Sequence, residues 1–96
     1  MFEWDARKAA VKRVKHGVSF AEATTVFGDP EALDGADLRH SDKERRFLRL
    51  GRAATGRVLI VAYTVRRRED GERIHIISAR RASPKEQAAY AAAPRS

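Results

Sequence analysis

Two runs of β-branched residues on either side of a short charged segment constrain the fold of this chain most strongly. Residues 58–65 are apolar and rich in valine, and residues 74–79 repeat that pattern with isoleucine. Length and composition favour buried strands over helices for both runs. Residues 66–73 form a charged turn centred on Asp70-Gly71, a dipeptide suited to turns that need positive φ. The two runs therefore predict an antiparallel hairpin at the centre of the protein.

A third strand is expected before the hairpin, because residues 45–52 alternate in part between apolar and charged side chains. Residues 53–56 supply the turn into the central strand. The sequence thus predicts an antiparallel meander with strands at residues 45–52, 57–66 and 73–80. Strict alternation along the last strand divides its side chains between two faces, with Ile74, Ile76, Ser78 and Arg80 on one and His75, Ile77, Ala79 and Arg81 on the other.

Three residues in N-cap positions predict helices around this meander. Asp5 precedes a helix over residues 6–16, Ser19 one over residues 20–27, and Ser83 one over residues 84–92. After each serine a glutamate stands at the third helical position, which completes a capping box. We therefore expect a single α+β domain over residues 1–96, with N-terminal helices, an antiparallel meander and a C-terminal helix.

Charge narrows the class of function. Lys and Arg number 20 against 13 Asp and Glu, so the formal net charge is +7. Arginine supplies most of the positive charge, and its planar fork suits bidentate contacts to phosphate. Nucleic acid or an acidic partner is therefore favoured, while the simpler interpretation, that the excess charge only aids solubility, remains open.

Other classes of site and location are disfavoured by what the sequence lacks. It has no cysteine, which excludes disulfides, zinc–thiolate sites and cysteine nucleophiles. No apolar segment approaches the roughly 20 residues of a membrane span, and the N-terminus has no signal-peptide apolar region. We expect a cytoplasmic protein without a membrane anchor or a metal site.

Five blocks of the sequence together resemble the BrnT family of bacterial type II toxins. They cover nearly the whole chain in the family's order and read FEWDARKA, KHGVSFAEATTVFGDP, RFLRLGR, GRVLIVAYT and RIHIISARRASPKEQAAY. The resemblance implies a RelE-like fold and an endoribonuclease that needs no metal or other cofactor, cleaves RNA and inhibits translation. Whether cleavage requires the ribosome is left open. The charged turn at residues 66–73 is longer and more basic than the family pattern, so it is either an extra RNA contact or an exposed tip.

The same resemblance implies a protein partner. It implies that a BrnA-like antitoxin neutralises the toxin in a heterotetramer of two toxins and two antitoxins, and that this complex represses its own operon. Operator DNA is then bound only through the antitoxin. Phe2 and Trp4 are either anchors for this antitoxin or part of the core.

Metal-free RNA cleavage uses the ribose 2′-OH as nucleophile, so the protein must move protons and stabilise charge on phosphorus. His16 is the expected proton-transfer group, because its reference pKa of about 6.5 suits neutral pH. The alternative is that His16 only interacts with the C-terminus of its helix. Arg49, Arg80 and Arg81 are the candidates for charge stabilisation, and the sequence leaves open which of them faces the substrate.

Other residues are candidates for holding RNA. Lys8, Lys12 and Lys15 recur at i, i+4 and i+7 and form one basic stripe, which either follows phosphates or is a solvated face. Tyr63 stacks on a base or packs in the core, and Ser78 shares a strand face with Arg80. Composition equally allows a basic module that binds RNA, DNA or a protein without cutting, or an inactive co-repressor component.

Overall fold

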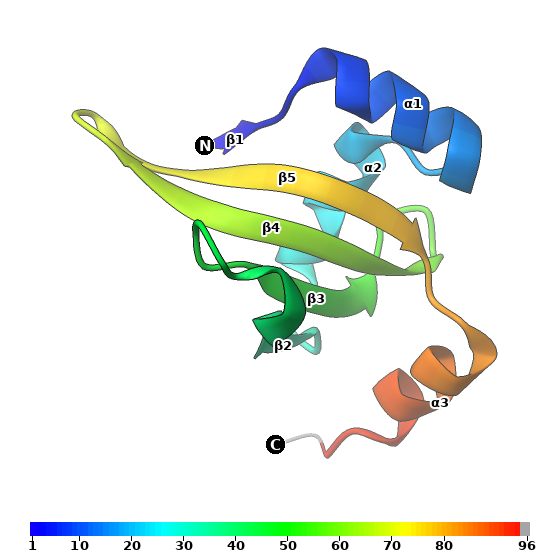
Figure 1. The fold of residues 1–96 in the computed structure, drawn as a ribbon. Coiled ribbons are helices and arrows are strands. Elements are labelled where there is room, and N and C mark those ends of the chain that lie inside the picture. Colours follow the sequence, from blue (N-terminus) through cyan, green and yellow to red (C-terminus); the bar gives the residue numbers. More distant parts are fainter. Residues whose placement is uncertain (95–96) are drawn as a thin grey trace.

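The computed structural model describes residues 1–94 and contains, within them, a five-stranded sheet and three α-helices. In chain order the elements are β1 (Phe2–Glu3), α1 (Ala6–His16), α2 (Phe20–Thr25), the 3₁₀ turn η1 (Val26–Gly28), β2 (Leu33–Ala36), the 3₁₀ turn η2 (Leu38–His40), β3 (Phe47–Arg52), β4 (Val58–Arg68), β5 (Gly71–Arg81) and α3 (Pro84–Ala92). Figure 1 shows α2 passing behind β5 and β4, α1 above the β5 side of the sheet, and α3 below the sheet. The expected α+β class is confirmed. No helix within residues 1–94 is long and apolar enough to span a bilayer.

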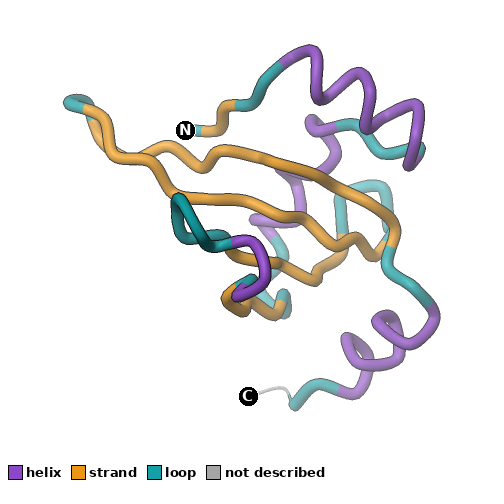
Figure 2. Tube along the Cα trace, in the orientation of Figure 1, coloured by secondary structure: helices purple, strands orange, loops and turns teal. Residues whose placement is uncertain are grey.

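The sheet has the order β1-β5-β4-β3-β2, with the expected meander at its centre. Strands β2 to β5 pair antiparallel, but β1 pairs parallel with β5, so the sheet is mixed and has two edge strands beyond the meander. The charged turn predicted at residues 66–73 is wrong in extent, because β4 runs to Arg68 and β5 starts at Gly71. Gly71 adopts a φ of 124°, which allows a tight reversal. Figure 2 shows the resulting hairpin as a long arm with a short loop at its tip.

A β-bulge in β5 overturns the predicted division of its side chains. Ala62 pairs with Ser78, but the next residue, Tyr63, pairs with Ile76, so Ile77 is the extra residue of β5. As a result Ile74 and Ile76 share the core face with Ala79 and Arg81, while His75 shares the opposite face with Ser78 and Arg80. The sequence missed this because no Gly or Pro marks the bulge.

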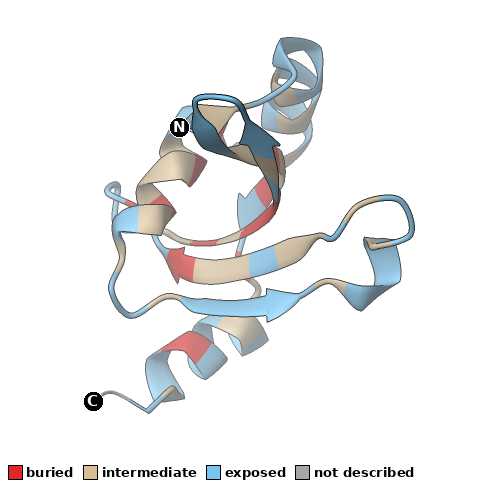
Figure 3. Ribbon diagram, turned by 90° about the vertical axis from the view of Figure 1, so that its left-hand side faces the viewer, coloured by how far each residue is buried: buried red, intermediate tan, exposed pale blue. Residues whose placement is uncertain are grey.

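The core lies between one face of the sheet and the segment from Val18 to η1. Leu59 and Val61 of β4 are fully buried there against Val18, Ala23 and Val26. Figure 3 shows that buried residues concentrate in these strands and in α2, with one further buried turn in α3. The sheet is thus covered tightly on this face by α2.

The second helix is shorter than predicted and its N-terminus is only half of a capping box. α2 ends at Thr25 and continues as η1, instead of as one helix over residues 20–27. The Ser19 Oγ accepts a hydrogen bond from the Glu22 N–H at 3.0 Å. The Glu22 carboxylate binds Arg57 and Thr55, because a guanidinium is a stronger partner than a backbone amide.

Aromatic contacts place the N-terminal residues. The Phe2 ring packs on Phe27 with centroids 5.2 Å apart, so Phe2 belongs to the core. Trp4 meets Phe20 edge-on at 6.1 Å and remains 38% exposed. Of the two aromatic anchors considered for a partner, only Trp4 is thus left with a large accessible surface.

Gly51 of β3 sits where the segment after α2 crosses the sheet. A Cβ atom added at this position would lie 2.8 Å from Val26 Cγ1 and 2.9 Å from Ala32 Cβ. Both atoms belong to short, packed side chains, so Gly51→Ala is expected to lower the free energy of unfolding by about 1–3 kcal/mol. Urea denaturation would measure this loss. Gly35→Ala is the control, because its new methyl group meets nothing within 4 Å, and an equal loss in both variants would contradict the argument.

Candidate nucleic-acid interface

Three chain segments meet where α1 and β5 end and β4 begins. Gly17 ends α1 in the left-handed conformation, with φ 70°, and its carbonyl accepts a hydrogen bond from Arg57 Nη2 at 3.1 Å. α1 packs against β5, and the right-hand side of Figure 1 shows the ends of α1 and β5 together with the start of β4. We call this region the cationic end, and define it by Lys12, Lys15, His16, Arg52, Arg57, Arg80 and Arg81.

His16 is the one imidazole of the cationic end. It is half-buried in the last turn of α1. Lys12, one turn earlier, is also half-buried. Partial burial lowers the pKa of His16, and the positive charges of Lys15, Lys12 and Arg80 lower it further. Burial and positive neighbours both disfavour the imidazolium. At neutral pH His16 is therefore an uncharged base surrounded by cations, which is the state required to accept a proton beside a bound phosphate.

Arg80 faces the same region with a fixed orientation. Its Nη1 and Nη2 donate to the two carboxylate oxygens of Glu86 at 2.7 and 2.8 Å, and Nη1 also donates to the Arg81 carbonyl. A guanidinium has five N–H donors, so the Nε–H and one Nη2–H stay available. Glu86 offsets the charge of Arg80, but the Arg80 side chain is 44% exposed, so its free donors can still hydrogen-bond a phosphate.

The Arg80–Glu86 pair gives a pH-dependent stability. The hydrogen bonds from Arg80 lower the pKa of Glu86 to about 2 from 4.5. A depressed pKa means that the stabilisation is complete above about pH 4.5 and is lost as the pH falls toward 2. Glu86→Gln should therefore remove this acid dependence and cost about 1–2 kcal/mol at pH 7, since solvent screens the part-exposed pair. Urea titrations at several pH values test this.

The control for this prediction is Glu72→Gln. Glu72 pairs with Arg67 in the hairpin, where both side chains are more exposed. Its loss should change the free energy of unfolding by no more than about 0.5 kcal/mol. If Glu86→Gln keeps the acid dependence of the wild type, the pair does not cause it.

Arg81 lies on the other face of β5 from Arg80. Within residues 1–94 its exposed side chain makes no hydrogen bond or ion pair. The pKa of Glu22 is lowered mainly by its hydrogen bond from Arg57 and, to a smaller extent, by the charge of Arg81. Arg57, which the sequence did not single out, binds Glu22 through Nε at 2.9 Å and is thereby neutralised. The sequence carries no signal for this pair, because its members are far apart in the chain.

Two residues proposed from sequence lie elsewhere, in the packing between β3, β4 and η1. Arg49 donates to Asp34 and to the Val26 carbonyl, and its guanidinium covers the Phe27 ring at 5.1 Å. Tyr63 is buried and donates to Asp34 Oδ1 at 2.8 Å, and burial raises its pKa to about 12. Both side chains tie β2 and η1 to the sheet, so neither is placed to contact a bound strand.

The remaining candidates are divided between the cationic end and its surroundings. Ser78 is half-buried on the same face of β5 as Arg80. Lys8 and Lys15 are exposed on α1, while Lys12 is half-buried. The lysines of the predicted stripe therefore differ in exposure, and Lys15 and Lys12 are the two whose charges act on His16 together with Arg80.

A second charged cluster, which sequence reasoning did not find, lies near the other end of β5. His75 Nδ1 is 2.8 Å from Glu3 Oε2, and Arg66 Nη2 donates to Glu44 at 3.0 Å. Arg68 also donates to Glu3, and hydrogen bonds from these arginines lower the pKa of Glu3 and of Glu44. The carboxylates neutralise the arginines, so this cluster fastens β1 and the segment before β3 to the sheet and attracts phosphate weakly.

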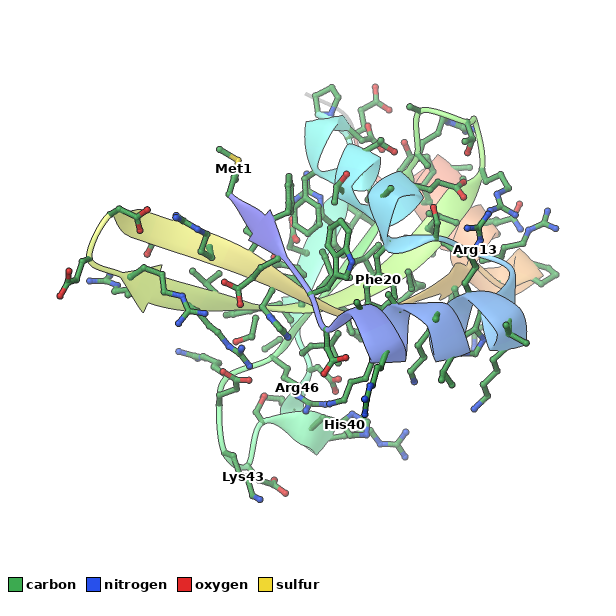
Figure 4. The ribbon with its side chains drawn as sticks, turned by 90° about the horizontal axis from the view of Figure 1, so that it is seen from above. Met1, Arg13, Phe20, His40, Lys43 and Arg46 are labelled. Atoms are coloured by element: carbon green, nitrogen blue, oxygen red, sulfur yellow. The ribbon has the colours of Figure 1, made fainter. Side chains whose placement is uncertain are left out.

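The loop before β3 carries further cations. Figure 4 shows His40, Lys43 and Arg46 grouped on this loop, well apart from Arg13 on α1. His40 Nδ1 is 3.0 Å from Asp37 Oδ2. In the described part of the chain, residues 1–94, no three His, Cys, Asp or Glu side chains are grouped to hold a metal ion.

Comparisons with known proteins gave a match to a protein family and a match to a solved structure. Residues 4–86 match the family model described as "Ribonuclease toxin, BrnT, of type II toxin-antitoxin system". The fold is similar to the 1.1 Å crystal structure of the Brucella abortus ribonuclease toxin, BrnT, with a TM-score of 0.59 and 22% sequence identity over 86% of this chain and 97% of that one. A search of curated protein sequences gave no match.

Proposed function

Since the chain belongs to the BrnT family of ribonuclease toxins of type II toxin–antitoxin systems, we propose that it is an endoribonuclease that cuts RNA at its cationic end without a metal ion. The observation that carries this proposal is the position of His16, an imidazole with a lowered pKa beside Lys12 and Arg80. Positive groups attract the RNA backbone, and a neutral imidazole among them can accept the proton of a 2′-OH.

The proposed reaction is an internal transesterification. His16 removes the proton from the ribose 2′-OH, the O2′–P bond forms and the P–O5′ bond breaks. Arg80 and Lys12 stabilise the negative charge that develops on the phosphate oxygens. The leaving 5′ oxygen takes a proton from water, which reaches the exposed end freely. The products are a 2′,3′-cyclic phosphate and a 5′-OH.

Cell function follows from this chemistry and from the family. We propose that RNA cleavage in the cytoplasm inhibits translation and arrests growth. A BrnA-like antitoxin neutralises the toxin in a heterotetramer, and that complex represses the operon through the DNA-binding part of the antitoxin. An acidic segment of the antitoxin laid over the cationic end would block RNA by charge alone.

The direct test is cleavage of a defined RNA by the purified protein in excess EDTA. We expect cleavage with and without the chelator, and cyclic-phosphate ends on the products. Cleavage that stops in EDTA and returns with Mg²⁺ would show that the metal-free mechanism is wrong. If the RNA is bound but stays intact, also in a translation extract that supplies ribosomes, the protein is a binding module.

A further inference from the structure

A groove opens within the cationic end, between the β3–β4 turn, the end of β5 and α3. Its walls include Arg52, Arg57, Arg81, Gln87 and Tyr90, and it encloses about 380 Å³. That volume lies in the range of pockets for small molecules, about 300–1,000 Å³. It is large enough for one nucleotide or part of one.

The wall formed by α3 is held rigidly. Tyr90 is the buried residue of α3, and its hydroxyl donates to Asp29 Oδ2 at 2.6 Å. The same oxygen accepts a hydrogen bond from the Arg52 backbone N–H at 2.8 Å. Gln87 Nε2 donates to the Ala82 carbonyl at 3.0 Å. These contacts fix the helix against the sheet, so the groove is formed before any ligand arrives.

Positive charge in the groove is not balanced. The Arg57 charge is neutralised by Glu22. The Asp29 carboxylate already accepts hydrogen bonds from the Tyr90 hydroxyl and from the Arg52 backbone N–H. The Arg52 guanidinium lies over the Tyr90 ring, 5.6 Å from its centroid, and its Nη1 donates a hydrogen bond to the Gly56 carbonyl. Arg52 also hydrogen-bonds the Tyr90 side chain, which leaves part of its N–H groups for a ligand. Arg81 makes no side-chain hydrogen bond or ion pair within residues 1–94. Two arginines therefore face one groove, and no carboxylate of residues 1–94 lines it.

We propose that this groove is a second phosphate subsite, in which Arg52 and Arg81 bind the backbone phosphate of an RNA nucleotide adjacent to the one that is cut. Charge-assisted contacts from two guanidinium groups suit a phosphate, which offers several acceptor oxygens. Arg80 and Arg81 are neighbours on opposite faces of β5. One RNA chain that passes the end of β5 could therefore place one phosphate at Arg80 and the next at Arg81. This inference rests on the proposed function for the identity of the ligand.

The test measures binding of a fluorescent single-stranded 2′-O-methyl RNA, which cannot be cut, by anisotropy. We expect Arg81→Gln and Arg52→Gln each to raise Kd about fivefold or more. Each should also reduce the slope of log K against log salt concentration by about 0.7, the value for one lost phosphate contact. The matched control is Arg67→Gln, the same charge change at an 88% exposed side chain near the hairpin tip, and it should stay within about twofold of wild type.

The three variants and a 5′-phosphorylated RNA together distinguish a specific subsite from a general effect of charge. Equal weakening in all three variants would mean that only net charge matters, and no weakening in Arg81→Gln would likewise overturn the subsite. Arg81 makes no side-chain hydrogen bond or ion pair within residues 1–94, so we expect Arg81→Gln to fold even if Arg52→Gln disturbs Tyr90. A tighter Kd for a 5′-phosphorylated RNA, lost in Arg81→Gln, would assign the groove to a terminal phosphate instead of an internal one.

The readout is independent of catalysis. Because the probe has no free 2′-OH, a protein that never cuts RNA would give the same binding curves. Failure to cleave native RNA with intact groove binding would remove the proposed function and keep the subsite. If native RNA is cleaved but neither Arg52→Gln nor Arg81→Gln weakens binding, the proposed function stands and the subsite is wrong.

Discussion

His16→Asn is expected to reduce the rate of RNA cleavage by about 10²–10⁴-fold while leaving RNA binding nearly unchanged. This is the usual contribution of one general base. Asparagine keeps the size and polarity of the side chain but cannot accept a proton at neutral pH. Single-turnover cleavage of a defined RNA, with the protein in excess, measures the chemical step without the contribution of binding.

The pH profile makes this prediction more specific. Burial and nearby cations lower the pKa of His16 below its usual value of 6.5. The neutral form is the active base, so the wild-type rate should rise with pH, with a midpoint below 6.5, and then become level. His16→Asn should lack this acid limb.

His40→Asn is the control for both experiments. His40 is an exposed loop residue that contacts Asp37, and it lies outside the cationic end. Its replacement should leave rate and pH profile as in the wild type. A His16→Asn protein that cuts within about threefold of the wild-type rate would remove His16 from the mechanism and leave it as a residue at the helix C-terminus.

Leu59→Ala should lower the free energy of unfolding by about 2–5 kcal/mol, the largest stability effect that we expect from a single substitution. Leu59 is fully buried in β4 between the sheet and the α2 segment. Its truncation leaves a cavity among side chains that are already close-packed. A loss of this size is a large part of the stability of a small domain, so the variant should be partly unfolded near 37 °C.

Val65→Ala is the matched control for this substitution. Val65 lies on the same face of β4 but is 42% exposed, so its loss should stay within about 1 kcal/mol. Urea denaturation of both variants and of the wild type tests the difference. Equal losses would mean that burial at Leu59 does not dominate the core.

The local signals in the sequence predicted the elements well. The N-caps Asp5, Ser19 and Ser83 place all three helix starts, because capping chemistry is encoded within a few residues. The apolar runs at residues 58–65 and 74–79 likewise place the central hairpin. What failed was the fine pattern within it, where one bulged residue, Ile77, reverses the faces of β5.

Contacts between residues that are distant in the chain could not be predicted from the sequence. Whether Arg49 is free or bound depends on Asp34 and on carbonyls near η1, which only the folded chain brings together. In the same way the Arg80–Glu86 pair depends on how α3 turns back after β5. Charge composition predicted an anion-binding surface. It could not separate Arg81, which makes no side-chain ion pair within the described residues 1–94, from a neutralised arginine such as Arg57.

The central claim is that RNA lies on the cationic end, and NMR mapping tests it most directly. Isotope-labelled protein would be titrated with a non-cleavable single-stranded 2′-O-methyl RNA while amide shifts are followed. We predict the largest changes in the last turn of α1, at Arg80 and Arg81, and at the start of α3. Changes confined to the tip of the β4–β5 hairpin or to the loop before β3 would contradict the account.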